Sequence, residues 1–404
     1  MKCHRLKVFI VCAILLGTSE LANAACNQTL SPGANLASAI SSAAAGTTIC
    51  LNSGSYGSVT LGSFTKSPRV IVQATTPLGP TMGLSAQSGA NGVTFDGISF
   101  TSGATISGSL TKNITIQNSD FGTRQLAIST VNFNNNNILI DHNTFGAHNA
   151  TGCEGRLCIT WGGGPGSVPA GVVVSNNTFG PGGCSDGIQV GSYGVVIGPG
   201  NTFTGIVQGN CAAHVDAIQG YGQSHTTVTG NYFTNNTVDL GFYDGGASEV
   251  FTHNVLEHSS SNGVAVQCGT ISNPLYEHNT MKNAGVNFNG KPENGNTTNL
   301  LLRNNIFLGS SRVNLTQNGT PACTNCTVTN NLFDTSNIAS GSNNLIGTPT
   351  FVGGSSPNTW TAYQLSSASL GKNAGSDGKD MGINGSGTDT DAIPPSPPTN
   401  LRVQ

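Results

Sequence analysis

Charged side chains are scarce in this chain of 404 residues. Lys, Arg, Asp and Glu together make up 8% of it, against about 25% in an average soluble protein. Little charge together with 55 Gly and many Asn, Ser and Thr would favour disorder, but Val, Ile and Phe recur at regular intervals and can form a core. The composition therefore predicts a folded protein with a mostly uncharged, polar surface.

Long apolar runs are also absent, except for one at the N-terminus. Lys2, Arg5 and Lys7 precede an apolar run from Val8 to Leu16 that is too short to span a bilayer, and Ala22-Asn23-Ala24 fits a cleavage site. We predict that residues 1–24 are a signal peptide and that the mature chain is secreted, either extracellular or periplasmic. No other segment predicts a membrane association after its removal.

Positive charge is in short supply as well. Removing Lys2, Arg5, Lys7 and Glu20 from the 15 basic and 18 acidic residues leaves 12 and 17, a net charge of −5. This charge argues against nucleic acid as a partner. An acidic substrate would need local positive charge or a metal ion.

We expect the mature protein to be a monomer.

Helical patterns are nearly absent, and β-rich segments recur every 21 to 34 residues. Each segment ends in a polar pair or triplet and then an aromatic or large apolar residue, as in ILIDHNTF, VVVSNNTF and TVTNNLF. The segments end at Phe121, Phe145, Phe179, Phe203, Phe233, Leu256, Met281, Phe307 and Phe333, with a looser copy at Phe100. Repeats of this period made of short strands predict an all-β solenoid, a single-stranded right-handed parallel β-helix.

An Asn stands two places before the last residue in eight of these segments. The eight are Asn143, Asn177, Asn201, Asn231, Asn254, Asn279, Asn305 and Asn331. We interpret them as an inward ladder that holds a corner of the coil. His142, His253 and His278 directly precede this Asn and are interpreted as corner residues rather than catalysts.

Two parts are predicted to follow the signal peptide of residues 1–24. The β-helix domain is predicted over residues 25–388, and its first coil is expected to be capped by a short helix from Asn35 to Ala44. A Pro-rich tail follows over residues 389–404.

Nine cysteines remain once Cys3 and Cys12 leave with the signal, and export makes disulfides plausible. Neighbouring positions suggest the pairs Cys26–Cys50, Cys153–Cys158, Cys184–Cys211 and Cys323–Cys326, with Cys268 unpaired. Cys184 and Cys211 are about one coil apart, so this bridge would connect adjacent rungs.

The other half of each repeat is less regular and carries a column of polar residues. In SDGIQVGS, HVDAIQGYG and VDLGFYDGG we align Asp186, Asp216 and Asp239, and Gln189 with Gln219. Matching residues on adjacent parallel strands stack about 4.8 Å apart.

Neighbouring carboxylates repel, and three outcomes remain open. One carboxyl takes a raised pKa and the two form an acid/base pair. Alternatively, Asp186, Asp216 and Asp239 bind a cation, with Ca²⁺ favoured by oxygen ligands. In the third, the Asp side chains bond backbone N–H groups at a turn.

Other polar and aromatic residues lie close to this column in the sequence. His214, two residues before Asp216, is a candidate base, and Arg156 is a candidate base, carboxylate ligand or salt-bridge partner of Glu154. The expected substrate-binding residues are aromatic platforms or hydrogen-bonding groups: Trp161, Gln189, Gln219, Tyr221, Tyr243 and Asp244.

The capping helix, the coils with Asn before an aromatic residue and the Asp-Gly-type strands together resemble the pectin-lyase-like right-handed parallel β-helix superfamily. The order ILIDHNTF, an irregular stretch and then VVVSNNTF is similar to that of pectate lyases. The paired Arg motif of pectate lyases is missing, as are the Asn-Thr-Asp, Asp-Asp and Gly-His-Gly blocks of polygalacturonases. The resemblance implies a secreted carbohydrate-active protein and assigns no catalytic residue.

Three functions follow from this resemblance and the polar column. The first is a polysaccharide lyase that cleaves a uronate-containing chain by β-elimination, with His214 or Arg156 as base and Asp186 and Asp216 as cation ligands or proton relay. The second is a glycoside hydrolase that uses the stacked Asp pair. The third is a non-catalytic carbohydrate-binding or adhesive rod.

Overall fold

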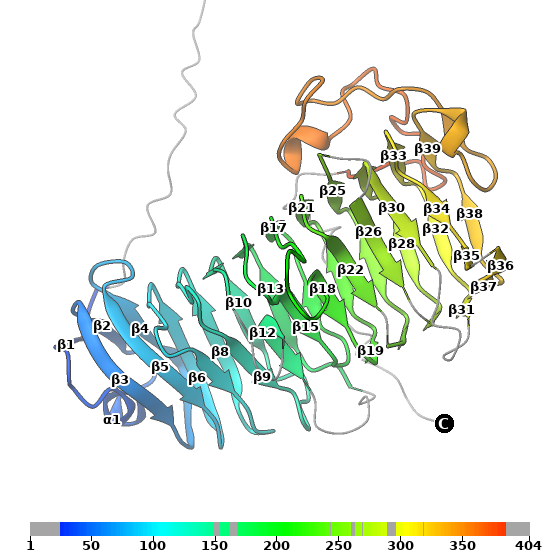
Figure 1. Ribbon diagram of the computed structural model, residues 1–404. Coiled ribbons are helices and arrows are strands. Elements are labelled where there is room, and N and C mark those ends of the chain that lie inside the picture. The colour runs from blue at the N-terminus through cyan, green and yellow to red at the C-terminus, as the bar shows by residue number, and fades with distance from the viewer. Residues whose placement is uncertain are drawn as a thin grey trace, which may run out of the picture.

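The computed structural model describes residues 25–148, 154–160, 168–242, 244–259, 263–268, 270–288, 296–317 and 319–384. In this part of the chain, short strands wind into one continuous coil whose successive turns stack as long parallel sheets (Figure 1). This architecture confirms the predicted all-β, right-handed parallel β-helix. The predicted signal peptide and Pro-rich tail lie outside the described residues.

Three long sheets form the sides of the coil. The 13-stranded sheet contains β1 Gln28–Leu30, β2 Thr48–Leu51, β4 Phe64–Ala74, β6 Ala90–Asp96, β8 Lys112–Gln117, β10 Ile138–Asp141, β13 Val172–Ser175, β16 Val196–Ile197, β20 Thr227–Thr229, β24 Val250–Thr252, β28 Leu275–Glu277, β32 Leu301–Arg303 and β38 Thr327–Thr329. The 11-stranded sheet contains β3 Gly54–Leu61, β5 Pro80–Ala86, β7 Ala104–Ile106, β9 Leu126–Ser129, β12 Gly155–Thr160, β15 Asp186–Val190, β18 Asp216–Gly220, β22 Val238–Phe242, β26 Gly263–Cys268, β30 Ala284–Asn287 and β34 Val313–Asn314. The nine-stranded sheet contains β11 Thr144–Phe145, β14 Thr178–Phe179, β17 Thr202–Thr204, β21 Tyr232–Thr234, β25 Val255–Glu257, β29 Thr280–Lys282, β33 Ile306–Leu308, β39 Leu332–Phe333 and β40 Leu345–Ile346.

Two smaller sheets complete the structure. A five-stranded sheet contains β19 Gln223–Ser224, β23 Gly246–Ala247, β27 Ile271–Ser272, β31 Thr297–Thr298 and β37 Cys323–Thr324, and a two-stranded sheet pairs β35 Thr316–Gln317 with β36 Thr320–Pro321. Among the described strands, only β35 and β36 pair in antiparallel fashion.

The Asn ladder forms the corner between the 13-stranded and nine-stranded sheets, as predicted. The Asn177 backbone N–H and side-chain amide both donate to Asn201 Oδ1, at 2.9 and 3.0 Å, and the same exchange links Asn143 to Asn177. All eight ladder residues are buried. The ladder satisfies the buried backbone groups that a sharp bend would otherwise leave unpaired.

The residue before each ladder Asn explains how the chain makes this bend. It adopts the left-handed backbone conformation in every turn, with φ of 54° at His142, 58° at His253 and 54° at His278. Asn and Gly take the same place in other turns, for example at Asn176 and Gly200. Non-Gly residues reach this conformation most readily when they are Asn, Asp or His. These three His residues are therefore corner residues, as predicted.

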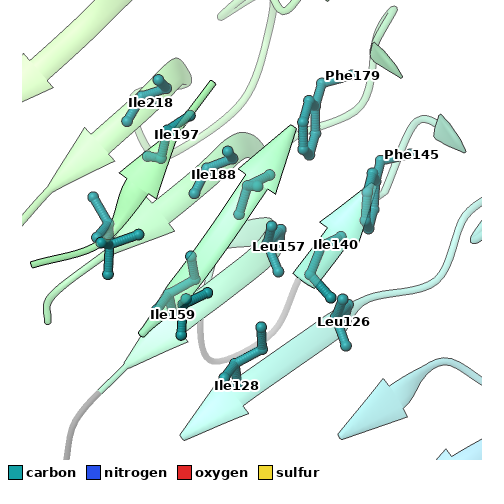
Figure 2. Close-up of a cluster of buried hydrophobic side chains, with 14 of the residues drawn as sticks. Leu126, Ile128, Ile140, Phe145, Leu157, Ile159, Phe179, Ile188, Ile197 and Ile218 are labelled. Atoms are coloured by element: carbon teal, nitrogen blue, oxygen red, sulfur yellow. The ribbon is translucent and has the colours of Figure 1, made fainter. Parts of the chain in front are cut away.

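Inside the coil, apolar side chains stack in columns from turn to turn. Leu126, Leu157, Ile188 and Ile218 occupy matching positions on successive strands of the 11-stranded sheet (Figure 2). A second column consists of stacked rings: Phe100, Phe121, Phe145, Phe179, Phe203 and Phe233, with adjacent centroids 4.6–4.8 Å apart. The spacing between strands brings identical residues into contact, so a repeated sequence produces a continuous core.

Both ends of the described coil are covered. Helix α1 (Leu36–Ser42) begins at Asn35, whose side chain accepts a hydrogen bond from the Ser38 backbone N–H, and it buries Leu36 and Ile40 at the first turn. This confirms the predicted capping helix. At the other end, residues 348–384 form an irregular segment that folds back beside β25 and β33 (Figure 1).

The buried His278 and the partly buried His253 hold this returning C-terminal segment. His278 Nε2 lies 2.9 Å from Asp377 Oδ2, and His253 Nε2 lies 3.0 Å from Asn384 Oδ1. The segment contains the 3₁₀ turn η3 (Thr361–Tyr363), and another 3₁₀ turn, η2 (Ser336–Ile338), precedes β40. The corner histidines thus attach the end of the chain to the coil.

Three of the predicted disulfides are present: Cys26–Cys50, Cys184–Cys211 and Cys323–Cys326. The predictions for Cys153 and for the Cys268 side chain fall outside the described part of the chain. No helix among the described residues combines the length and apolarity that a membrane span requires.

Candidate active site

The candidate site lies where β15 and β18 begin on the 11-stranded sheet. The two strands pair in the predicted register, with Ile188 beside Ile218 and Gln189 beside Gln219. This register brings the Asp residue that starts each strand next to the other, and the Asp216 backbone N–H donates to Asp186 Oδ1 at 2.7 Å. The aligned DGIQ and DAIQ segments therefore position two carboxylates on adjacent rungs.

A third titratable group joins these carboxylates. His214 Nδ1 lies 2.8 Å from Asp216 Oδ2, and one ligand atom from each of Asp186, His214 and Asp216 lies within 4.8 Å of the others. The His214 side chain is 49% exposed, whereas the Asp216 side chain is fully buried. His214 is thus the member of the cluster that presents itself to solvent.

Two glutamines enclose the cluster on its other side. Gln189 Nε2 lies 2.5 Å from Gln219 Oε1 and 3.4 Å from Asp186 Oδ2. Gln219 Nε2 lies 3.3 Å from His214 Nε2. Gln189 is partly exposed, whereas Gln219 is only 6% exposed.

Burial changes the ionisation of the cluster. Burial, together with the nearby Asp216 charge, raises the pKa of Asp186 to about 7, although the hydrogen bond from the Asp216 backbone opposes the shift. The hydrogen bond to Asp216 raises the pKa of His214 above its ordinary value, although partial burial opposes it. Near neutral pH Asp186 is therefore partly protonated, and perturbed pKa values of this kind are typical of functional sites.

Arg156 lies beneath the site and does not reach the surface. It is fully buried, donates from Nε to Ser185 Oγ at 3.2 Å and from Nη2 to the Gly182 carbonyl, and leaves Nη1 without a partner. Burial lowers the pKa of Arg156 to about 10, although the Asp186 charge opposes the shift. The expected salt bridge to Glu154 is replaced by these contacts to the turn before β15.

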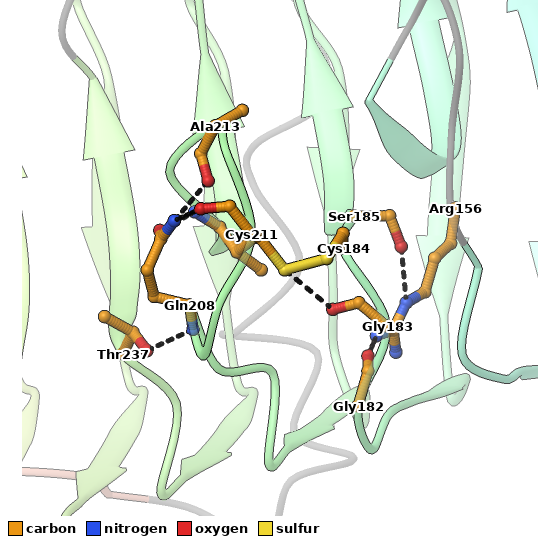
Figure 3. Close-up of a disulfide and its surroundings, with 10 residues drawn as sticks. Arg156, Gly182, Gly183, Cys184, Ser185, Gln208, Cys211, Ala213 and Thr237 are labelled. Carbon is orange, nitrogen blue, oxygen red and sulfur yellow. Dashed lines mark hydrogen bonds between the residues drawn. A yellow bond between two sulfur atoms is a disulfide. The ribbon is translucent and has the colours of Figure 1, made fainter.

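The loop that carries His214 is fastened at several points. Figure 3 shows Cys184 and Cys211 joined by a disulfide, with Gln208 inside the loop. Gln208 donates from Nε2 to the Cys211 carbonyl at 2.9 Å and accepts from the Val215 N–H at 2.7 Å. No repeat or motif in the sequence marks Gln208, so its role could not be predicted.

The expected alignment of Asp239 with Asp216 is wrong. Asp216 pairs with Val238, and Ile218 pairs with Leu240, so Asp239 lies one position further along. Asp239 is buried and contacts His258 Nε2 at 2.8 Å and Asn236 Nδ2 at 2.9 Å. It does not belong to the cluster of Asp186, His214 and Asp216.

The remaining expected substrate-binding residues are spread more widely. Tyr221 directly follows β18, at the opposite end of the strand from Asp216, and its ring packs over Gly191. Asp244 is exposed in the turn after β22. Trp161 and Tyr243 lie outside the described residues.

Comparisons by sequence identify no relative: no family model matches the chain, and no curated protein does. Comparison with solved structures finds the PL6 family polysaccharide lyase Pedsa3628 from Pseudopedobacter saltans, with a TM-score of 0.53 and 13% identity over 80% of this chain and 91% of that one. A mannuronic acid specific family 6 lyase from human gut microbiota has a TM-score of 0.47, with 10% identity over 80% and 91% of the two chains. The pectate lyase Pel9A has a TM-score of 0.46, with 15% identity over 89% and 96%. At 13% identity the likeness to Pedsa3628 concerns the fold alone.

Proposed function

We propose that this protein is a polysaccharide lyase that cleaves a uronate-containing chain by β-elimination, with His214 as the base. The observation that carries the proposal is the half-exposed His214 imidazole, held 2.8 Å from the buried Asp216 carboxylate. A base must be accessible to the substrate and correctly oriented. Among the described members of the cluster, His214 meets both conditions.

In this reaction His214 Nε2 removes the proton from the sugar carbon next to the carboxylate. The bond between the β carbon and the glycosidic oxygen then breaks, a carbon–carbon double bond forms, and the leaving oxygen takes a proton from water. Asp216 accepts the hydrogen bond from Nδ1–H, so the lone pair of the neutral ring lies on Nε2. Asp216 also stabilises the imidazolium that forms during proton transfer.

Asp186 affects how the site accepts an acidic sugar. A second fully charged carboxylate would repel the uronate, but the raised pKa of Asp186 (about 7) keeps much of this group neutral near neutral pH. Gln189 and Gln219 lie beside it and offer hydrogen-bonding groups to sugar hydroxyls. Arg156 orients the turn before β15 and is buried too deeply to act as the base.

The two carboxyl groups of the cluster could balance the charge of a bound cation. Asp186 and Asp216 would hold it, because their mutual repulsion is part of what raises the pKa of Asp186. Ca²⁺ prefers six to eight oxygen ligands, so the two buried carboxylates would supply only part of its coordination and water the remainder. Such an ion would stabilise the negative charge that develops beside the carboxylate.

Turnover on defined polymers tests the proposal. The mature protein is incubated with polygalacturonate, alginate, glycosaminoglycans and neutral glycans, with added calcium or with a chelator. Ultraviolet absorbance from an unsaturated uronyl product is followed together with new reducing ends. The lyase proposal requires both signals on a uronate polymer, and calcium dependence would add the cation.

The hydrolase alternative gives reducing ends without absorbance. The raised pKa of Asp186 beside Asp216 favours it, because such a pair resembles an acid and a nucleophile. Both carboxylates are fully buried, however, and this limits their access to a glycosidic oxygen. A protein that binds glycans but releases no product would instead be the carbohydrate-binding rod.

A further inference from the structure

A groove lies on the nine-stranded sheet, whereas the candidate active site lies on the 11-stranded sheet. It has a volume of about 440 Å³ and runs between the nine-stranded sheet and the returning C-terminal segment. The sheet contributes Thr202, Tyr232 and the backbone at Gly200 and Gly230, and the segment contributes Thr359 and Trp360. Figure 1 shows this segment, in orange, beside the edge of the coil.

Two aromatic side chains in this groove are fixed by their polar ends. The Trp360 indole N–H donates to the His253 carbonyl at 2.7 Å, and the Tyr232 hydroxyl donates to Glu257 Oε2 at 2.7 Å. Both side chains stay partly exposed. Because the hydrogen bonds hold the rings in place, little conformational entropy is lost when a ligand packs against them.

The groove lining is uncharged. All the residues that line it are Gly, Asn, Thr, Tyr or Trp. This contrasts with the acidic cluster on the 11-stranded sheet. Hydroxyl and amide groups next to fixed aromatic rings match a ligand with apolar ring faces and many hydroxyls, and the lining has no cationic side chain to pair with a carboxylate.

We propose that this groove binds a stretch of uncharged carbohydrate. One sugar ring packs against Trp360 or Tyr232, and its hydroxyls bond to the Thr202 and Thr359 side chains. The C-terminal segment thereby forms one wall of a binding site, and His253 and His278 hold that wall in position. The site is separate from the Asp186, His214 and Asp216 cluster, so binding here does not depend on the lyase proposal.

Binding is measured with neutral hexasaccharides of glucose, xylose and mannose, and with a galacturonate oligomer for comparison. The chain contains two Trp, so the Trp161→Phe variant leaves Trp360 as the only indole reporter. We expect at least one neutral hexasaccharide to change its fluorescence at saturating concentration and to bind more tightly than the galacturonate oligomer. Absence of binding by all the neutral hexasaccharides overturns the proposal.

Matched variants locate the binding site. Thr144, Thr178, Thr202 and Tyr232 follow one another on adjacent strands, so Thr144 lies on the same outer column as Thr202 but outside the groove. Thr202→Arg should fill the groove and weaken binding, measured by calorimetry, at least about tenfold. Thr144→Arg should leave it unchanged, and equal effects of both substitutions would refute the location.

Two further measurements test whether the sugar binds in the active site instead, and whether a second copy of the chain occupies the groove. His214→Gln should retain neutral-sugar binding, and its loss would place the ligand in the active site instead. If sedimentation shows a dimer that Thr202→Arg dissociates, the groove is a contact between two copies of the chain and the carbohydrate proposal fails.

Discussion

The half-exposed His214 imidazole is hydrogen-bonded to the fully buried Asp216 carboxylate. Nδ1 and Oδ2 are 2.8 Å apart. The carboxylate therefore fixes the ring from below, while the other ring nitrogen lies beside Gln219. This arrangement makes the pair the most direct target for mutation.

Replacing His214 should remove most of the activity. In the His214→Gln variant the base is lost, and we expect kcat to fall by about 10²–10⁴-fold with little change in thermal stability. His142→Gln is the matched control, because His142 is also exposed and paired with a neighbouring Asp, 2.7 Å from Asp141. Equal activities of the two variants would exclude His214 as the base.

Asp216 should control the pH dependence. The hydrogen bond from Asp216 raises the pKa of His214, and the base form exists only above that pKa. Asp216→Asn should lower this pKa, so the acidic limb of the kcat/KM profile should move to lower pH while the maximum falls. An unmoved acidic limb would show that another group, such as Asp186, sets it.

The Cys184–Cys211 disulfide should matter more for activity than the other described bridges. It fastens the loop that presents His214 and closes a segment of 27 residues. Replacing both cysteines by Ser should cost about 2–4 kcal/mol of stability and lower kcat severalfold. The double Ser variant of Cys323 and Cys326, which are three residues apart, is the control and should retain full activity below its unfolding temperature.

The Asn ladder should carry a measurable share of stability. Asn231→Ala removes the acceptor of the Asn201 amide and the donor to the Ile197 carbonyl, and leaves buried groups unpaired. We expect a loss of roughly 2–4 kcal/mol in chemical denaturation. Asn134→Ala, at an exposed Asn in a loop, should cost less than about 0.5 kcal/mol.

Glu249 should make the protein less stable at alkaline pH. Burial raises the pKa of Glu249 to about 8, against about 4.3 in an unfolded chain. The folded protein keeps this proton while the unfolded chain releases it, so the stabilising contribution is complete below about pH 4 and is lost as pH rises to 8. Glu249→Gln should therefore raise stability by roughly 1–3 kcal/mol at pH 9 and change it little at pH 4. A gain of equal size at both pH values would contradict the linkage.

The repeat features of this fold could be predicted from the sequence because each depends on a period. The Asn two places before the last residue in eight of the segments and the alignment of DGIQ with DAIQ both follow from the repeat and from strand stacking. The ladder corner, the ring column and the pairing of Gln189 with Gln219 are present as expected. The half-exposed His214 beside Asp216 also agrees with its place two residues earlier in the chain.

Features that depend on contacts between distant segments could not be predicted. Matching the Val-Asp pairs places Asp239 beside Asp216, but the apolar residues decide the register, since Ile218 must stack on Leu240. The burial of Arg156 depends on the turn at Gly182, and the groove at Trp360 depends on a segment that returns from 107 residues away along the chain. No local sequence pattern predicts the contact of Arg156 with Gly182 or that of Trp360 with His253.

The turn from Ile188 to Ile218 spans 30 residues, whereas the next, from Ile218 to Leu240, spans 22, yet all three residues share one column. The additional length lies in the loop before β18, outside the stacked strands. This loop carries His214 and the disulfide-bonded Cys211, and its buried Ile206 packs in the core. A turn of the coil can thus gain residues that carry polar side chains while the strands on either side of it keep their register.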